Sequence, residues 1–252
     1  MKTAVPLRVA TWNIHKGVRG LGMRRTLEIH DMVHAVEQFD ADIICLQEVR
    51  SVNHKEANYF TRWPELLQAD YLAPEGYEAV YRSNAITRHG EHGNALLSRW
   101  PVISHQHEDM SDHRFEQRGL LHSEVLVAGA PVHVIVVHLG LIAASRARQL
   151  AQLAVFIERE IPQAAALVVA GDFNSPGVPV KWAQHALKSK AAPTHASTTK
   201  LPRTATFPSR LPLVQLDHVF ARHAVPVASH VPRGAVWARM SDHLPLIVDF
   251  TL

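Results

Sequence analysis

The sequence predicts an α/β fold, a four-layer α-β-β-α sandwich in which two packed sheets, mixed and largely antiparallel, are flanked by helices. Short apolar runs of strand length, bounded by Gly, Pro or charged residues, recur along the 252 residues. Each half of the chain also has one segment of helical period directly before a buried strand. Many strands combined with strand-helix-strand order in each half favour two sheets covered by outer helices.

The apolar runs predict the strands in chain order. In the first half they predict strands at residues 7–13, 42–49, 94–98 and 101–106. In the second half they predict strands at residues 120–128, 131–139, 166–173, 216–221 and 244–250. The turn Ala128-Gly129-Ala130-Pro131 lies between two of these runs, so it predicts a hairpin and hence antiparallel pairing.

Two segments have the apolar spacing of a helix. One runs from Arg24 to Phe39 and the other from Ala143 to Ile161, and in each an apolar stripe recurs every three or four residues. Residues 187–215 are instead rich in Ala, Pro, Thr, Ser and Lys, which predicts a long irregular excursion of the kind that often has a function. The length suits one domain over residues 1–252.

Composition excludes several classes of protein. No stretch of 18 apolar residues exists, and Pro6 and Arg8 precede any signal-like run, so we expect neither a membrane span nor export. The single cysteine, Cys45, has no partner for a disulfide, which favours the cytoplasm, and we expect a stand-alone monomer. Residues 175–241 carry nine Lys and Arg against one acid, Asp217, a balance that suits a polyanionic or phosphate-bearing partner.

Polar residues interrupt or follow the apolar strands where the strands end. They are Asn13, Glu48, His138, Asp172 with Asn174, and further along the chain Asp217, Asp242 and His243. Strand ends in α/β sheets share clefts, so these distant residues are expected to meet. Carboxylate and amide oxygens suit a hard cation, Mg²⁺ or Mn²⁺, with Glu48 as the first ligand, and histidines that titrate near neutral pH suit phosphoester hydrolysis.

The same residues lie in motifs that closely resemble the endonuclease/exonuclease/phosphatase superfamily, which includes DNase I-like nucleases, inositol polyphosphate phosphatases and neutral sphingomyelinases. The motifs are, in the family's order, TWNI, LQEV, GNALLSRWP, VHLG, GDFN, LDHVF and SDHLP. Each is weak alone, but together they are specific and span nearly the whole chain.

The resemblance implies a role for each matched residue. Glu48, Asn13 and Asp242 would hold the metal, directly or through water. His243 would be the general base or water-orienting group, with Asp217 fixing its imidazole. Asp172 and Asn174 would position water or the leaving oxygen and hold the phosphate, and His138 would contact the phosphate or act as an acid. Asn94 and Arg118 lie in further family patterns and could orient a neighbour or the phosphate.

The sequence also departs from one branch of the family. His15 stands two residues after Asn13, where abasic-site endonucleases tend to have an acid, and His138 stands where they prefer tyrosine. Both differences point away from a dedicated abasic-site enzyme.

The leading hypothesis is therefore a divalent-metal-dependent phosphodiesterase of nuclease type acting on nucleic acid. The alternatives are a phosphodiesterase or phosphatase acting on phospholipid headgroups or small molecules, and a catalytically silent nucleic-acid-binding module. A zinc hydrolase is a further alternative, drawing on the many histidines, but these lack familiar zinc spacing: His89, His92, His105, His107 and His113.

Overall fold

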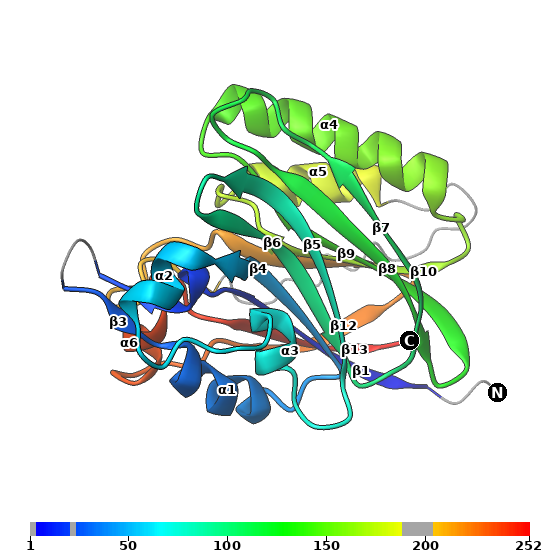
Figure 1. Cartoon of the computed structure of the whole chain (residues 1–252). Helices are drawn as coiled ribbons and strands as arrows, with labels where there is room; N and C mark the ends of the chain where they lie inside the picture. Colours follow the sequence, from blue (N-terminus) through cyan, green and yellow to red (C-terminus); the bar gives the residue numbers. More distant parts are fainter. Residues whose placement is uncertain (1–3, 21–23, 188–203) are drawn as a thin grey trace.

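The computed structural model describes residues 4–20, 24–187 and 204–252. Two sheets pack face to face, with α4 (Ala143–Glu160) and α5 (Val178–Ala186) outside one sheet and α1 (Ile29–Gln38) and α3 (Gln68–Leu72) outside the other (Figure 1). The predicted four-layer α-β-β-α sandwich is therefore confirmed.

The first sheet has the strand order β12-β13-β1-β4-β6-β5. Its strands are β1 (Pro6–Asn13), β4 (Ile43–Asn53), β5 (Glu78–Thr87), β6 (Gly90–Ser98), β12 (Val225–His230) and β13 (Leu246–Thr251). Only β1 and β4 pair in parallel, joined by the crossover helix α1, and the other neighbours are antiparallel.

The second sheet repeats this plan in the order β11-β10-β9-β8-β7. Its strands are β7 (Val102–Asp109), β8 (Gly119–Val127), β9 (Ala130–His138), β10 (Ala166–Asp172) and β11 (Asp217–Arg222). Here β9 and β10 are the parallel pair, joined by α4. The predicted hairpin joins β8 to β9, and its turn residues Ala128 and Gly129 both have positive φ, as a two-residue hairpin turn requires.

Three apolar clusters bind the four layers. The central cluster lies between the sheets and joins side chains such as Val9 and Cys45 of the first sheet to Val134 and Val168 of the second. The second cluster packs α1 and Trp12 against the first sheet, and the third packs α4 against the second sheet. Because the central cluster draws on both halves of the chain, it supports the proposal of a single domain over residues 1–252.

All nine predicted strands are present, and so is the predicted helix over 143–161. The helix predicted from Arg24 begins later, at Ile29, because residues Thr26–Leu27 form a short strand, β3, paired with β2 (Val18–Arg19). The ion pair between Arg19 and Glu28, at 3.0 Å, holds this small ribbon against the helix start.

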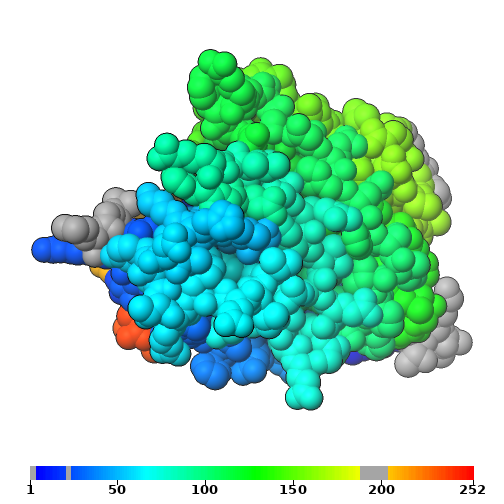
Figure 2. Space-filling model, viewed as in Figure 1, coloured from blue at the N-terminus to red at the C-terminus, as the bar shows by residue number. Residues whose placement is uncertain are grey.

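Several elements carry no clear sequence signal and were not predicted. They are β2, β3, β5, β12, α3, α5, the short helices α2 (His54–Tyr59) and α6 (Trp237–Met240), and the 3-10 turn η1 (His15–Gly17). In the space-filling view, the segment that carries α2 and α3, coloured cyan, covers much of the visible face (Figure 2).

The predicted irregular stretch 187–215 lies partly outside the described residues, which exclude 188–203. Its described part, 204–215, contains a bridge between Phe207 and Val214 but neither a strand nor a helix, as predicted. Within the described residues, no helix is long and apolar enough to cross a membrane.

Candidate active site

The two parallel strand pairs end at a common edge of the sandwich. In the first sheet Asn13 pairs with Gln47, so Glu48 lies one residue beyond the end of β1. In the second sheet Asp172 pairs with His138. Parallel strands point their carboxyl ends the same way, which is why residues 13, 48, 138 and 172 meet although they are far apart in sequence.

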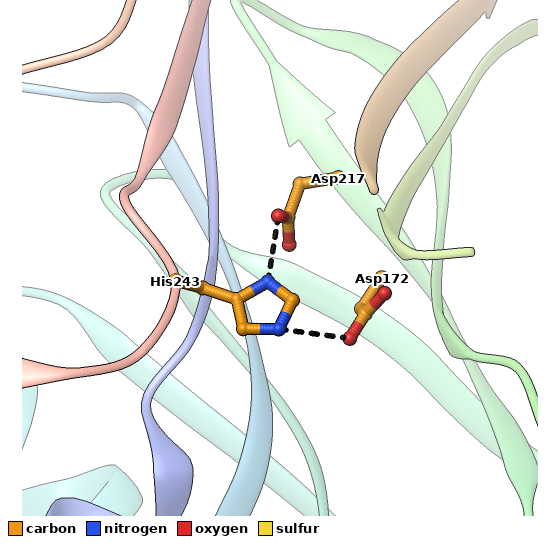
Figure 3. A group of neighbouring side chains, drawn as sticks. All are labelled: Asp172, Asp217 and His243. Atoms are coloured by element: carbon orange, nitrogen blue, oxygen red, sulfur yellow. Dashed lines mark hydrogen bonds and ion pairs between the residues drawn. The ribbon is translucent and has the colours of Figure 1, made fainter. Parts of the chain in front are cut away.

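His243 lies between two buried carboxylates (Figure 3). Its Nδ1 is 2.8 Å from Oδ2 of Asp217, and its Nε2 is 3.6 Å from Oδ2 of Asp172. Asp217 begins β11 and Asp172 ends β10, whereas His243 lies in the loop between α6 and β13 of the other sheet. The triad therefore crosses the interface between the sheets.

The charges of this triad depend on one another. Burial disfavours a charged His243, but Asp217, through its charge and hydrogen bond, and Asp172 raise the His243 pKa to about 10. Burial raises the pKa of Asp172, and the neighbouring Asp217 raises it further. An imidazolium held between two carboxylates is the favoured state at neutral pH, because burying two carboxylates without a cation is costly.

Asn13 connects this triad to Glu48. Its Nδ2 donates to Oδ2 of Asp172 at 3.1 Å and to Oε1 of Glu48 at 3.3 Å, while its Oδ1 accepts from the backbone N–H of His15. A direct contact between Oδ1 of Asn13 and a metal beside Glu48 would therefore need the side-chain amide to flip. Ser241 completes the connection, since its hydroxyl donates to the Asn13 carbonyl and accepts from the His243 N–H.

Two basic side chains contact the predicted metal ligands. Nζ of Lys16 is 3.0 Å from Oε2 of Glu48, and Nδ1 of His15 is 3.3 Å from Oδ1 of Asp242. Burial opposes ionisation of Glu48, yet nearby His138, Lys16 and His15 bring its pKa well below the usual range. Burial likewise opposes ionisation of Asp242, but the hydrogen bond and charge of His15 lower its pKa.

His15 and Lys16 were not among the predicted site residues. The sequence signal was their position directly after the TWNI motif, where His15 was noted only as a departure from another branch. Both have positive φ, as do Glu48 and Asn174. Non-glycine residues in this region are strained, and such strain concentrates at functional sites.

The remaining predicted residues support Asp172. The Asn174 backbone N–H donates to Oδ1 of Asp172 at 2.8 Å, and its side chain donates to the Leu139 carbonyl. Nε2 of His138 is 3.6 Å from Oδ2 of Asp172. Burial, together with the charge of Arg118, lowers the pKa of His138 to about 4, so His138 is neutral at neutral pH.

Asn94 and Arg118 have structural partners. Asn94 is fully buried between the sheets, where its amide donates to the carbonyls of Gly119 and Val136. Arg118 donates to the Leu139 carbonyl and pairs with Glu116. Their described contacts are thus with the scaffold around the site.

A divalent metal has two candidate positions. Among the described residues, Asp172, Asp217 and His243 form the one group of three whose ligand atoms lie within 4.8 Å of one another, and none of the other histidines belongs to such a group. In that group, however, the imidazole faces one carboxylate with each ring nitrogen, so it already occupies the space between them and offsets part of their charge. Nearby basic groups keep both Glu48 and Asp242 ionised, so their carboxylates form the second candidate position.

Comparison with known proteins agrees with the motifs. The model of the endonuclease/exonuclease/phosphatase family matches residues 10–243. Uncharacterized protein YbhP of Escherichia coli (strain K12) is 36% identical over 253 residues, covering 97% of this chain and 96% of that protein.

Solved structures share the fold. An endonuclease/exonuclease/phosphatase from Beutenbergia cavernae DSM 12333 has a TM-score of 0.71 at 21% identity, covering 98% of this chain and 72% of that chain. D. rerio TDP2, complexed with a single-strand DNA product, has a TM-score of 0.66 at 16% identity, covering 97% of this chain and 98% of that chain. Because the family model spans most of the sequence and a full-length relative is 36% identical, the chain belongs to the endonuclease/exonuclease/phosphatase family.

Proposed function

We propose that this protein is a divalent-metal-dependent phosphodiester hydrolase of nuclease type. The observation that carries the proposal is the buried His243 held between Asp217 and Asp172, connected through Asn13 to an ionised Glu48. These contacts join a hydrogen-bond donor, a carboxylate and a candidate oxygen ligand in one connected group of side chains.

Glu48 and Asp242 would hold Mg²⁺ or Mn²⁺, with Asn13 contributing through water. The fit rests on the donor set, which is all oxygen, and on Glu48, whose buried carboxylate faces the cation of Lys16. When bound, the ion would neutralise phosphoryl oxygens and stabilise charge that develops on the leaving oxygen.

His243 would act mainly as a charged donor and water-orienting group. Asp217 fixes the ring through Nδ1, which leaves Nε2 directed toward Asp172. Because the His243 pKa is raised to about 10, the protonated ring suits stabilisation of phosphoryl charge better than removal of a proton from water.

Asp172 is then the better candidate for the group that takes a proton from the attacking water. Its raised pKa brings it toward the range in which a carboxylate is an effective base. Asn174 holds one carboxylate oxygen through its backbone N–H, and the other oxygen lies toward Asn13, His138 and His243. Neutral His138 would hydrogen-bond to the phosphate or to Asp172 rather than act as an acid.

Nucleic acid is the proposed substrate class. Arg210, Arg233 and Arg239 of the basic C-terminal part are exposed, although Arg222 is buried and donates to backbone carbonyls. A phosphate backbone is the polyanion that such side chains suit. The single buried thiol of Cys45 supports a reducing compartment, for which we propose the cytoplasm.

A substrate panel tests the proposal. Purified protein is incubated with plasmid DNA, an abasic oligonucleotide, RNA, sphingomyelin and glycerophosphodiesters, each with Mg²⁺ or with EDTA. We expect cleavage of DNA or RNA that requires Mg²⁺. Turnover of lipids alone would select the phospholipid alternative, and nucleic-acid binding without cleavage would favour the silent binding module.

A further inference from the structure

A cavity lined by arginines lies beside the loop between α6 and β13 that carries His243, which we call the catalytic loop, and outside the site described above. It has a volume of about 620 Å³, within the range of small-molecule sites. Arg210 of the loop after Phe207, Arg233 of the loop after β12, and Arg239 of α6 line it, and we call it the arginine pocket. The remaining lining residues are small, hydroxylic or apolar, and Leu244 is the deepest of them in the core.

The positive charge of the arginine pocket is largely unmatched. None of its lining residues is acidic. Within the described part of the chain, neither Arg210 nor Arg233 forms an ion pair, and Arg239 has only Asp31 at 3.6 Å, with both side chains about half exposed. By contrast, other arginines at the same end of the molecule, such as Arg19 and Arg25, pair with Glu28 and Glu56 at 3.0 and 2.6 Å.

Three guanidinium groups around a cavity repel one another unless an anion joins them. Guanidinium is the side-chain group best shaped to bind phosphate, since its planar fork donates two parallel hydrogen bonds. A phosphate is therefore a ligand that suits this lining.

The pocket shares its wall with the catalytic loop. The Ser209 N–H donates to the Asp242 carbonyl at 2.7 Å, and its hydroxyl donates to the Ser241 carbonyl at 2.7 Å. The ring of Phe207, in the same loop as Arg210, has its centroid 5.0 Å from that of His243. A ligand in the pocket would thus lie against the segment that positions His243.

We propose that the arginine pocket is a subsite for a second phosphate of the substrate, distinct from the phosphate being hydrolysed. This inference rests on the proposed function and deepens it, because it assigns the substrate to phosphoesters that carry a further phosphate near the scissile one. A nucleic-acid chain supplies such a phosphate from the neighbouring nucleotide, and a phosphorylated lipid headgroup is the other source of the same chemistry.

Direct binding tests the pocket without requiring turnover. Wild-type protein in EDTA is titrated with inorganic pyrophosphate by isothermal titration calorimetry. We expect the double variant Arg210→Ala/Arg233→Ala to bind at least about tenfold more weakly. The matched control Arg62→Ala/Arg88→Ala removes two exposed arginines from outside the pocket and is expected to bind as the wild type does. Circular dichroism checks that both variants are folded.

Kinetics test the substrate assignment. With Mg²⁺, we expect the wild type to cleave a dinucleotide that carries an added terminal phosphate with a higher kcat/KM than the same dinucleotide without it. The pocket variant is expected to lose this preference through a rise in the KM for the dinucleotide that carries the added phosphate. A preference shown only for a phosphorylated phosphatidylinositol in phosphatidylcholine vesicles, and lost in the same variant, would assign the second phosphate to a lipid headgroup.

The outcomes separate the two proposals. Pyrophosphate binding that is absent, or equal in both double variants, overturns the arginine pocket even if Mg²⁺-dependent turnover is found. Binding that is lost only in the pocket variant, with no turnover of any substrate, upholds the pocket while the proposed hydrolase function fails.

Discussion

At the scale of single residues, the charges of the site balance one another through a small number of pairs. His243 compensates two buried carboxylates, and Lys16 compensates Glu48. Removing one member leaves the opposite charge buried without a partner, which is a larger perturbation than loss of the contact itself.

Substitution of the His243 and Asp217 pair should abolish most activity without unfolding the protein. We expect His243→Ala and Asp217→Asn each to lower kcat by about 10²- to 10⁴-fold, because the charged donor is lost or no longer oriented. Steady-state kinetics on a cleaved substrate measure the effect. His34→Ala, at an exposed histidine of α1, is the control and should leave kcat unchanged. Equal loss in the control would show a nonspecific effect.

Substitution of Lys16 should strengthen metal binding. The Lys16 ammonium occupies the electrostatic position that a divalent ion would take beside Glu48, so the two compete. We expect Lys16→Met to tighten Mn²⁺ binding by about three- to tenfold, and Glu48→Gln to weaken it. Calorimetric titration of Mn²⁺ into the metal-free protein provides the measurement. Weaker binding in Lys16→Met would mean that the lysine assists the ion rather than competing with it.

At the scale of elements, the motifs that form the site also set the strand geometry. Glu48 lies at an irregularity of the β4 and β6 pairing and has φ of 57°, which turns its side chain out of the regular alternation. Gly171, directly before Asp172, has φ of 149°, and a Cβ there would lie 1.9 Å from the Val137 carbonyl oxygen. The glycine of GDFN therefore permits the close β9 and β10 pairing that places Asp172 beside His138.

Gly171→Ala should destabilise the protein through this contact. We expect the free energy of unfolding to fall by about 2–4 kcal/mol, because either the pairing of β9 with β10 or the backbone conformation at residue 171 must distort. Urea unfolding followed by fluorescence measures it. Gly129→Ala in the hairpin turn is a matched control, since its φ is also positive but nothing lies within 4 Å of the added carbon. A similar loss in both variants would show that φ strain, and not the close approach, is responsible.

A buried histidine pair between β8, β9 and α4 should make stability depend on pH. Nε2 of His122 is 3.0 Å from Nδ1 of His133, and Phe156 of α4 packs against His122. Burial, with a smaller effect from His133, lowers the pKa of His122 from 6.5 to about 4. The unfolded chain therefore binds the proton more tightly, and the stabilising contribution of neutral His122 is lost as pH falls from 6.5 toward 4.

Replacing His122 with Asn keeps hydrogen-bonding groups but removes the titration. Across this pH window, we expect the free energy of unfolding to fall by roughly 1–2 kcal/mol less in His122→Asn than in the wild type. Urea unfolding at pH values above and below the window tests this, with His34→Asn as the exposed control. Identical pH dependence in wild type and His122→Asn would contradict the interpretation.

At the scale of the whole molecule, both sheets carry the same pairing plan. Each has one central parallel pair closed by a crossover helix, with antiparallel strands on both sides. Facing the two sheets brings both parallel pairs to one edge, and a loop that leads into β13 adds His243. Two copies of a simple unit thereby assemble a site that neither sheet contains alone.

Sequence patterns predicted the strands of this plan because apolar runs such as residues 131–139 are buried on both faces. They missed β5, in which Arg82, Ser83 and Asn84 interrupt the apolar pattern, and the edge strand β12, which contains Pro226. The motifs pointed to the acids and to His243. They did not predict the pairing of Lys16 with Glu48 or the cluster of three arginines, because these contacts depend on loop conformations that hydrophobic periodicity does not predict.

We propose that the edge where both sheets end is a metal-dependent phosphoester-hydrolysing centre built around His243. Hydrolysis of bis(p-nitrophenyl) phosphate, a small diester that needs no specific pocket, tests it most directly. We predict turnover with Mg²⁺ or Mn²⁺ in wild type and His34→Ala, none in EDTA, and a loss of about 10²- to 10⁴-fold in His243→Ala. Turnover that persists in EDTA or in His243→Ala, or no turnover with any divalent ion, would contradict the account.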